Sequence, residues 1–459
     1  MIRAYPDRSS VASGDDVVLR VSTTAGRFRV DFYRFGAKTV LVARSEWHTG
    51  HDVPAHLPHQ DWGQDNVGLQ GEHLLAWPAY RFPVEPDWPP GVYIAVLLED
   101  GRPQQPNLHV DVDAREGRAL FVVRSDAPQP DAHVLYKLPL LTYHAYNCGS
   151  GDSRSWSLYT VPPPRDLPVA VPPCVSTCRP GGGTGGMPSD LANWDPFDPT
   201  PRQTFVHWDA RFIAWLEANG YAVDVCTDLD LDSDADLDLL GRYPLLVSAG
   251  HDEYWTDAMR GNVERAVDEG HSVAFFGGNT CWWRVTFDDH CSFRRGAEWS
   301  DPAAGQQPEN SLTGVSFRNG GERDRDDHPV PVGYRVQHAD HWVFDGTGAC
   351  DGTTFGDRQD EYLVGYECDG ADFARDVLER GGTVEPTGED GTPEDFLILG
   401  VGDLAPSGWG VGNRAATMGI YERGGTVFNG ATTDWPRLLG RNPVVDRITH
   451  NVIGRLSGS

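Results

Sequence analysis

The sequence predicts an α/β protein that begins with an all-β sandwich and continues as a parallel sheet with helices on both faces. Short apolar or alternating runs, separated by Gly, Pro and Asp, fill about the first 127 residues. A polar, Pro-rich linker at 125–131 follows. From residue 132 onward, apolar strands alternate with helical periodicity, which is typical of βαβ units. We therefore expect two domains, 1–127 and 132–459.

The strands of the first domain are recognised by their length and by their β-branched and aromatic residues. They are expected at 17–22, 28–33, 92–98 and 119–123. Turn residues separate them, and no helical periodicity lies between them, so these strands predict the sandwich.

The second domain is expected to alternate strand and helix. Its strands are predicted at 133–141, 221–225, 243–250, 272–278 and 424–429. Its helices are predicted at 208–217, from a Thr256 cap to Glu269, and near 443–456. Ligands of parallel sheets bind at the carboxyl ends of strands, so the site is expected just after 250 and 278.

The charge of the chain restricts its partners. With 38 Lys+Arg against 67 Asp+Glu, the formal net charge is −29. Such a field repels phosphate backbones and anionic membrane surfaces, so we expect neither nucleic-acid nor membrane partners. Lys38 and Lys137 are the only lysines, which argues against a catalytic lysine.

The acidic run at 224–238 is expected to be a solvated loop. A calcium loop counted from Asp228 would need Gly and Glu at its sixth and twelfth positions. Ser233 and Leu239 occupy those positions.

Cysteine usage and the chain start indicate a cytoplasmic protein with reduced thiols. Eight cysteines are too few for a disulfide scaffold in 459 residues, and the first residues lack an apolar signal segment. No run approaches the length of a membrane span. Cys174 and Cys178 are close in sequence, but without a second pair at zinc-ribbon spacing we favour a chance pair over a zinc site.

The densest polar cluster, His251 to Trp255, directly follows a predicted strand. A His, two carboxylates and a phenol can supply acid–base groups or hard metal ligands. The structural alternative is that Asp252 and Glu253 begin the next helix and interact with its dipole, while Tyr254 and Trp255 pack.

The second strand end, 276–284, offers an amide and a guanidinium. Asn279 can donate and accept, and Arg284 can clamp a carboxylate. Cys281 does not match a nucleophile elbow, because the bulky Trp282 follows it. The remaining candidates, each more often structural when taken alone, are Tyr143, His144, Tyr146, Asn147, Glu309, Asn310 and Glu367.

Taken together, these segments resemble the family of the N,N-dimethylformamidase large (β) subunit, specifically its small homologues. The match is ordered and spans about residues 5–457. It rests on Thr142–Asn147, Val175–Pro180, Gly250–Trp255, Phe276–Thr280 with Trp283 and Arg284, Pro308–Asn310, Gly365–Glu367 and Ala431–Trp435.

The resemblance implies an N-terminal β-sandwich and a domain similar to class I glutamine amidotransferases, with a flavodoxin-like parallel sheet. It also implies a hydrolase of a small amide C–N bond. In iron-dependent members, two tyrosines and a glutamate hold a mononuclear iron that polarises the carbonyl and activates water. Tyr146 matches one tyrosine, whereas Val175 and Ser292 stand at the other two positions. The cofactor is therefore left open: the metal is absent, or His251, Tyr254 and His290 help to hold it.

The leading hypothesis is an amide hydrolase in which Glu367, matching an acidic residue of the formamidases, is general base or nucleophile. The other expected site residues are listed by role: catalytic His251, Tyr254 and Glu253; substrate-binding Asn279, Asn310, Arg284, Tyr143 and Trp283; metal-binding Tyr146 and His290. Without a metal, Arg284 or Arg294 would face the developing oxyanion.

Other functions stay open. One is a non-catalytic protein that binds a small molecule, carbohydrate or protein on a degenerate amidotransferase-like scaffold, with Trp side chains as a stacking platform. Another is a tailoring enzyme with different chemistry. The expected partner of the hydrolase is a small-molecule substrate, and a homo-oligomer is left open.

Overall fold

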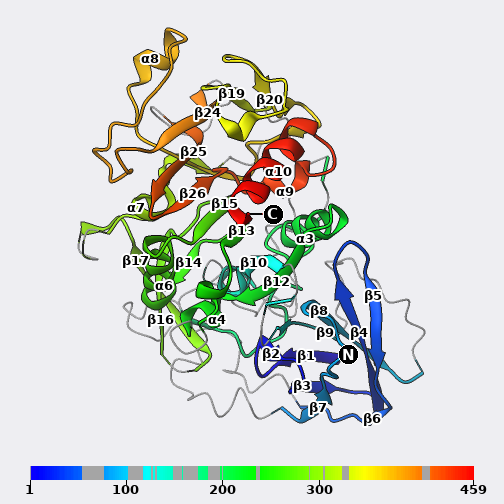
Figure 1. Cartoon of the computed structure of the whole chain (residues 1–459). Coiled ribbons are helices and arrows are strands. Elements are labelled where there is room, and N and C mark those ends of the chain that lie inside the picture. Colours follow the sequence, from blue (N-terminus) through cyan, green and yellow to red (C-terminus); the bar gives the residue numbers. More distant parts are fainter. Residues whose placement is uncertain are drawn as a thin grey trace.

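A computed structural model describes residues 2–53, 77–101, 117–125, 128–129, 132–147, 158, 174–184, 197–198, 200–233, 238–288, 290–302, 305, 307–322, 330–405 and 414–458. This part of the chain is mixed α/β, with several sheets and many parallel strands, as the sequence predicts (Figure 1). Part of the predicted linker, 126–127 and 130–131, lies outside the described residues.

The N-terminal strands form two sheets, drawn mainly in blue in Figure 1. The first sheet is antiparallel and contains β1 (Ile2–Pro6), β3 (Asp16–Thr23) and β7 (Ala79–Pro83). The second contains, in spatial order, β2 (Ser10–Ala12), β9 (Gly117–Arg124), β8 (Gly91–Glu99), β4 (Arg27–Phe35) and β5 (Val40–Arg44), with β6 (His48–Thr49) on β4. Leu19, Phe32 and Phe121, from both sheets, belong to one hydrophobic core.

β8 is buried along its whole length because its two faces pack in different cores. Tyr93, Ala95 and Leu97 join the core between the two N-terminal sheets. Val92 and Ile94 join the core of the second half of the chain. Successive side chains of a strand point to opposite faces, and both faces of β8 are covered. The segment is therefore a continuous apolar run.

A nine-stranded sheet forms the centre of the second half. Five neighbouring strands are parallel: β12 (Ala222–Thr227), β10 (Ala132–Leu138), β13 (Leu245–His251), β15 (Ser272–Gly278) and β26 (Gly425–Asn429). Numbered along the chain, these five have the order 2-1-3-4-5. The antiparallel strands β25 (Ala415–Arg423), β24 (Leu397–Asp403), β19 (Tyr334–Val336) and β20 (Thr354–Phe355) extend the sheet.

Helices cover both faces of this sheet (Figure 1). One face packs against α3 (Asp209–Ala218), α9 (Trp435–Leu438) and α10 (Pro443–Ser457). The other face packs against α1 (Leu140–Tyr146), α4 (Asp228–Asp232), η3 (Leu240–Arg242) and α6 (Asp257–Asp268). As predicted, Thr256 caps α6, with its Oγ accepting the N–H of Met259 at 3.1 Å.

Smaller elements complete the second half of the chain. A four-stranded sheet has the order β11 (Cys174–Ser176), β17 (Ser292–Glu298), β16 (Trp283–Phe287) and β14 (Tyr254–Thr256). The other elements are α7 (Asn310–Thr313), β18 (Ser316–Glu322), η5 (Trp342–Phe344), β21 (Asp357–Arg358), β22 (Glu361–Tyr362), β23 (Glu367–Gly370) and α8 (Arg375–Glu379). None of the helices in the described ranges has the length and apolarity needed to cross a bilayer.

The prediction that the acidic run is a solvated loop is wrong for residues 224–232, and residues 234–237 lie outside the described part of the chain. Thr227 and Asp230 form a capping box at the start of α4, and Asp224, Asp228 and Asp230 are buried. The Tyr243 hydroxyl donates to Asp224 at 2.7 Å. The alternating Asp and Leu residues suggested solvation, but tertiary partners compensate the burial of these carboxylates.

Candidate active site

His251 ends β13 and lies between two glutamates at the carboxyl edge of the parallel sheet. Its Nε2 is 2.7 Å from Oε2 of Glu367 and 3.3 Å from Oε2 of Glu253. All three side chains are buried. We call this group of three residues the His251 centre. Glu367 begins β23, far along the chain, so tertiary structure alone brings it to the strand end. A buried imidazole that shares a proton with a carboxylate is an acid–base pair.

The opposite nitrogen of the ring faces Gln203. Nδ1 of His251 lies 2.9 Å from Oε1 of Gln203, which is fully buried. Among the described residues, the side-chain atoms nearest to the two ring nitrogens are thus carboxylate and amide oxygens, which accept hydrogen bonds. An N–H at Nε2 points at Glu367, and an N–H at Nδ1 points at Gln203.

Asn279 holds the other side of Glu367. Its Nδ2 donates to Oε2 of Glu367 at 3.1 Å. Its backbone has φ of 51°, which is uncommon for a residue other than glycine. The carboxylate of Asp369 stabilises this conformation by accepting the N–H of Asn279 at 2.8 Å and that of Thr280 at 3.2 Å. Burial raises the pKa of Asp369 to about 7, although these two hydrogen bonds act in the opposite direction.

Gly278 permits the close approach of these segments. A Cβ at this position would lie 2.7 Å from the carbonyl oxygen of Glu367 and 2.8 Å from the backbone nitrogen of Thr433. Because both neighbours are backbone atoms, a larger residue would push β23 away from His251.

Two buried polar atoms beside this centre have no hydrogen-bond partner among the described residues. They are the acceptor Oδ1 of Asn279 and the donor Nε2 of Gln203. Gln203 also has a positive φ, of 54°. An unsatisfied buried polar group costs roughly 1–3 kcal/mol, and strained backbone clusters at functional sites. The residues that carry these two atoms contact opposite nitrogens of the His251 ring, so together they offer one donor and one acceptor to a ligand.

Glu253 is positioned by residues of α1. The Tyr146 hydroxyl donates to Oε2 of Glu253 at 2.9 Å, and Oγ of Thr142 accepts the N–H of Glu253 at 2.9 Å. The ring of Tyr254 packs edge-on against that of Tyr146, with centroids 6.5 Å apart. The alternative that Asp252 and Glu253 begin a helix is wrong, because β14 intervenes and α6 begins at Asp257.

The place of the centre follows from the strand order. α1 follows β10, and His251 ends β13, so the centre lies where the order 2-1-3-4-5 reverses direction. Parallel sheets bind ligands at this switch point because the connections there leave on opposite faces.

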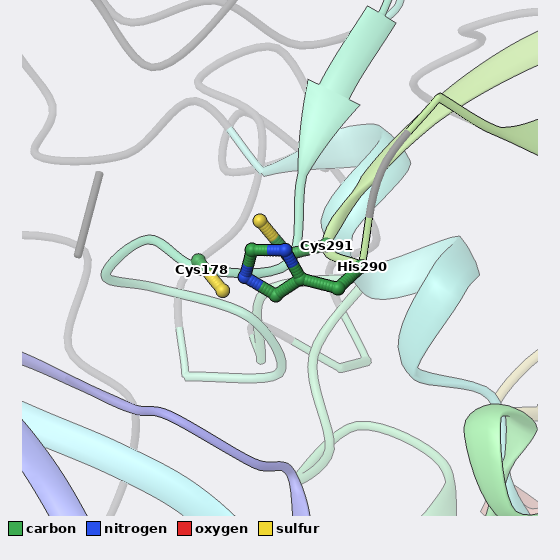
Figure 2. A group of neighbouring side chains, drawn as sticks. All are labelled: Cys178, His290 and Cys291. Atoms are coloured by element: carbon green, nitrogen blue, oxygen red, sulfur yellow. The ribbon is translucent and has the colours of Figure 1, made fainter. Parts of the chain in front are cut away.

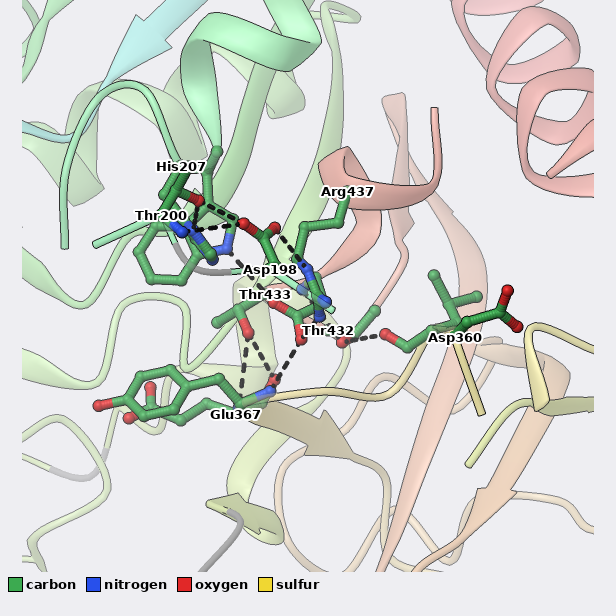
Figure 3. A network of polar contacts seen from close by, with 12 residues as sticks. Asp198, Thr200, His207, Asp360, Glu367, Thr432, Thr433 and Arg437 are labelled. Carbon is green, nitrogen blue, oxygen red and sulfur yellow. Dashed lines mark hydrogen bonds and ion pairs between the residues drawn. The ribbon is translucent and has the colours of Figure 1, made fainter. Parts of the chain in front are cut away.

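A second polar network holds the backbone of Glu367 (Figure 3). The backbone N–H of Thr433 donates to the carbonyl of Glu367 at 3.0 Å, and the N–H of Glu367 donates to Oγ of Thr433 at 3.2 Å. Asp434 accepts the N–H of Tyr366 at 3.1 Å and a hydrogen bond from Arg437 at 2.8 Å. The segment that leads into α9 thus fixes where Glu367 begins β23.

A buried ion-pair triad lies next to the centre. Nζ of Lys137 is 2.5 Å from Oδ1 of both Asp228 and Asp252. Burial alone would lower the pKa of Lys137, but the two carboxylates outweigh it and raise this pKa. Oγ of Ser248 also donates to Asp252, at 2.6 Å. The triad joins Lys137 of β10 to the residues that directly follow β12 and β13.

Tyr143, expected to bind substrate, instead donates to the carboxyl group of Asp209 in the core. Tyr136 donates to the same group at 2.8 Å. Burial raises the pKa of Asp209 to about 7, although the two tyrosine hydroxyls act in the opposite direction. The folded protein therefore binds a proton at Asp209 that the unfolded chain has lost above about pH 4.

We expect Asp209→Asn to change the pH dependence of stability. Between about pH 4 and pH 7 the native state of the wild type binds more protons than the unfolded state, so its unfolding free energy falls as pH rises. The variant lacks this group, so it should gain stability relative to wild type as pH rises. Urea unfolding across this range measures the difference. Asp257→Asn, at the exposed first residue of α6, is the control, and a difference independent of pH would contradict the prediction.

The other predicted site residues make contacts elsewhere. Arg284 and Trp283 lie on β16, where Arg284 pairs with Asp257 at 2.5 Å and Arg295 lies over the Trp283 ring. Arg294 pairs with Asp288 at 2.6 Å. Asn310, in α7, donates to Oγ of Thr392 at 3.1 Å. His290 lies beside Cys178 and Cys291. The structure thus brings together Tyr146, His251, Glu253, Asn279 and Glu367.

Sequence reasoning missed Gln203 and Asp369. Asp369 had a usable signal, because it follows Glu367 by two residues and therefore shares its face of the strand. Gln203 had none, since it ends a Gly- and Pro-rich segment without periodicity.

The positions implied for a mononuclear iron do not fit that ion. Val175 packs in the same apolar core as Tyr146, and Ser292 lies opposite Ser176 across the β11–β17 pair. An aliphatic side chain and a neutral hydroxyl do not replace an anionic phenolate and carboxylate, and the Tyr146 hydroxyl is bonded to Glu253.

Comparison with known proteins identifies one family. Residues 27–447 match the family model described as "N,N-dimethylformamidase beta subunit-like, C-terminal". No match to a curated protein is found. Among solved structures, the chain is similar to the crystal structure of murine CEACAM1b with 16% identity and a TM-score of 0.14, over 30% of this chain and 63% of that chain. The alignment thus spans less than two thirds of the murine chain.

Proposed function

Because this chain belongs to the N,N-dimethylformamidase beta subunit-like family, we propose that it is a hydrolase that cleaves the C–N bond of a small amide at the His251 centre. The observation that carries the proposal is the pair of buried atoms that have no hydrogen-bond partner in the described part of the chain, Nε2 of Gln203 and Oδ1 of Asn279. An amide presents the complementary acceptor and donor, its carbonyl oxygen and its N–H. Binding would remove the desolvation cost of both protein atoms.

The proposed reaction uses the side chains already in contact. Glu367 removes a proton from water, and the water oxygen attacks the carbonyl carbon, while Nε2 of Gln203 donates to the developing oxyanion. The C–N bond then breaks, and His251 donates its Nε2 proton to the leaving nitrogen. Glu367 returns the proton to His251, so the products are a carboxylic acid and an amine. Glu253, held by Tyr146, orients the ring.

The same proposal includes the finer fold assignment. We propose a β-sandwich over 1–127 and a class I glutamine amidotransferase-like domain over 132–459. The hydrophobic core shared by the two N-terminal sheets supports the first. The flavodoxin-like strand order 2-1-3-4-5 supports the second.

A panel of small amides tests the function. Purified protein is incubated with formamides and acetamides that carry zero, one or two N-methyl groups, and the released amine is measured. Turnover supports the proposal, and inertness toward the whole panel would count against it. Because Asn279 is proposed to accept from an amide N–H, substrates with an N–H should have lower KM than their N,N-dimethyl counterparts.

Asn279→Gly refines this test. Glycine keeps the positive φ but removes the carboxamide, so the backbone should stay in place. We expect kcat to fall by about 10²-fold, in the range for loss of one group that orients a catalytic residue. The control is Asn219→Gly, at the exposed C-cap of α3. Unchanged turnover in Asn279→Gly would contradict the assigned role.

Binding without turnover is the second candidate. It is favoured by Val175 and Ser292, which replace two of the three ligands implied by the resemblance. Calorimetric titration with the same amides separates the two functions, because a binding protein would give heat of association without release of amine.

A further inference from the structure

Three side chains of metal-ligand type converge outside the His251 centre. They are Cys178, His290 and Cys291, and their ligand atoms all lie within 4.8 Å of one another (Figure 2). Cys178 follows β11, whereas His290 and Cys291 precede β17. The N–H of Thr177 donates to the carbonyl of Cys291 at 2.8 Å, so a backbone bond holds the two segments together.

The donor set has the chemistry of a zinc site. Two thiolates and an imidazole suit zinc, which takes four ligands in a tetrahedron. With Zn–S and Zn–N bonds of standard length, tetrahedral ligand atoms are about 3.5–3.8 Å apart. The observed separation therefore requires only a small contraction. Cys178 and Cys291 are buried and His290 is exposed, so the imidazole can turn to complete the set.

The hydroxyl group of Ser176 forms hydrogen bonds with both cysteines. Oγ of Ser176 accepts the N–H of Cys178 at 3.0 Å and donates to Sγ of Cys291 at 3.4 Å. A hydrogen bond to a sulfur ligand orients it and stabilises its thiolate. Ser176 thus places both cysteines without being a ligand itself.

A cavity lies beside this cluster. It has a volume of about 520 Å³, and Cys178 and His290 line it together with Tyr5 of β1 and Asp7, which directly follows β1. Asp7 is paired with Arg20 at 2.5 Å. Water in the cavity can therefore complete the tetrahedron, as it does where three protein ligands hold zinc.

We propose that Cys178, Cys291 and His290 bind one Zn²⁺, with water from this cavity as the fourth ligand. The ion would join the turn after β11 to the turn between β16 and β17, next to the N-terminal sheets. The site is separate from the His251 centre and shares no residue with it, so it stands whether or not the chain hydrolyses amides.

Metal analysis of untagged, reduced protein tests the proposal. After incubation with Zn²⁺ and removal of the excess, we expect one zinc per chain by elemental analysis. Titration with Co²⁺ should give the thiolate-to-cobalt charge-transfer band and the intense visible bands of a tetrahedral site. Absence of zinc in the reduced wild type would overturn the proposal.

Variants assign the ligands. Cys178→Ser and Cys291→Ser should lose zinc and the charge-transfer intensity. His290→Ala alters an exposed side chain, so it should stay folded, and its zinc affinity should fall by at least about 10–100-fold. Cys350→Ser, at an exposed free cysteine, is the control. The assignment would be overturned if the control lost as much zinc as the cysteine variants. It would also be overturned if the double variant Cys178→Ser/Cys291→Ser still bound one zinc per chain.

A disulfide is the competing fate of the two thiols. Peptide mapping without reductant would detect a Cys178–Cys291 bridge. If the bridge forms and the reduced protein binds no zinc, the proposal is wrong; if zinc protects both thiols from oxidation, it is supported.

Discussion

Glu367→Gln is expected to abolish amide turnover while the protein stays folded. The substitution is isosteric, and Oε1 of glutamine can still accept from Nδ2 of Asn279, which lies 3.1 Å from the present carboxylate. The backbone of residue 367 keeps its bonds to Thr433, because they use main-chain atoms of this residue. The amide cannot remove a proton from water, however, so the reaction loses its base.

The expected size of this effect is about 10²–10⁴-fold in kcat, the usual contribution of a positioned general base. The loss should fall on kcat more than on KM, because the proposed substrate contacts are made by Gln203 and Asn279. Steady-state kinetics with the best amide of the panel measures both constants, and circular dichroism with thermal unfolding checks the fold.

Glu379→Gln is the matched control, since Glu379 is exposed in α8. It should retain wild-type kinetics. A folded Glu367→Gln protein with wild-type kcat would remove Glu367 from the mechanism, and equal loss in both variants would point to a general effect of charge.

Lys137→Met is expected to lower the unfolding free energy by about 3–5 kcal/mol, the usual cost of leaving buried charges without their partner. Lys137 is fully buried and lies 2.5 Å from carboxylate oxygens of Asp228 and Asp252. Methionine fills much of the same volume beside Trp255 but offers no charge. Two like charges would then face each other in an apolar environment.

The loss of unfolding free energy in Lys137→Met should depend on pH in a defined direction. Burial raises the pKa of Asp228 to about 6 even with Lys137 present, although the lysine acts in the opposite direction. In the variant this pKa should rise further, so that acidification neutralises the carboxyl group and removes the repulsion. The deficit should therefore be largest above this raised pKa and should shrink as pH falls toward about 6, where Asp228 of the wild type also becomes protonated.

Lys38→Met provides the control, because Lys38 is the other lysine of the chain and is exposed. Urea unfolding at several pH values compares the three proteins. The prediction fails if both substitutions have the same small effect, or if the deficit of Lys137→Met grows on acidification.

Local sequence pattern predicted most elements of the parallel sheet. The runs at 243–250 and 272–278 became β13 and β15, and the capped helix became α6. These predictions succeed because periodicity and capping act within a few residues. The same reasoning put His251 and Asn279 at neighbouring strand ends, and the register places His251 opposite Gly278.

Burial of charge could not be predicted in this way. Asp228 and Asp230 alternate with leucines in an acidic run, which is the pattern of a solvated segment. They are buried because Lys137 and Arg124 lie against them, and those residues belong to other strands. Whether a carboxylate can be buried depends on the partner charge, and the local sequence does not contain the partner.

The sequence by itself determined most of the order of strands and helices, the neighbouring strand ends at which His251 and Asn279 lie, and the family of the chain. Tertiary structure alone decided that Glu367 meets His251, that Gln203 closes the other side of the ring, and that Cys178 meets His290 and Cys291. The physical reason is the separation along the sequence over which each kind of interaction acts. Strand and helix propensities act between near neighbours, whereas these contacts depend on the strand order and on long connections that bring distant residues to one edge of a sheet.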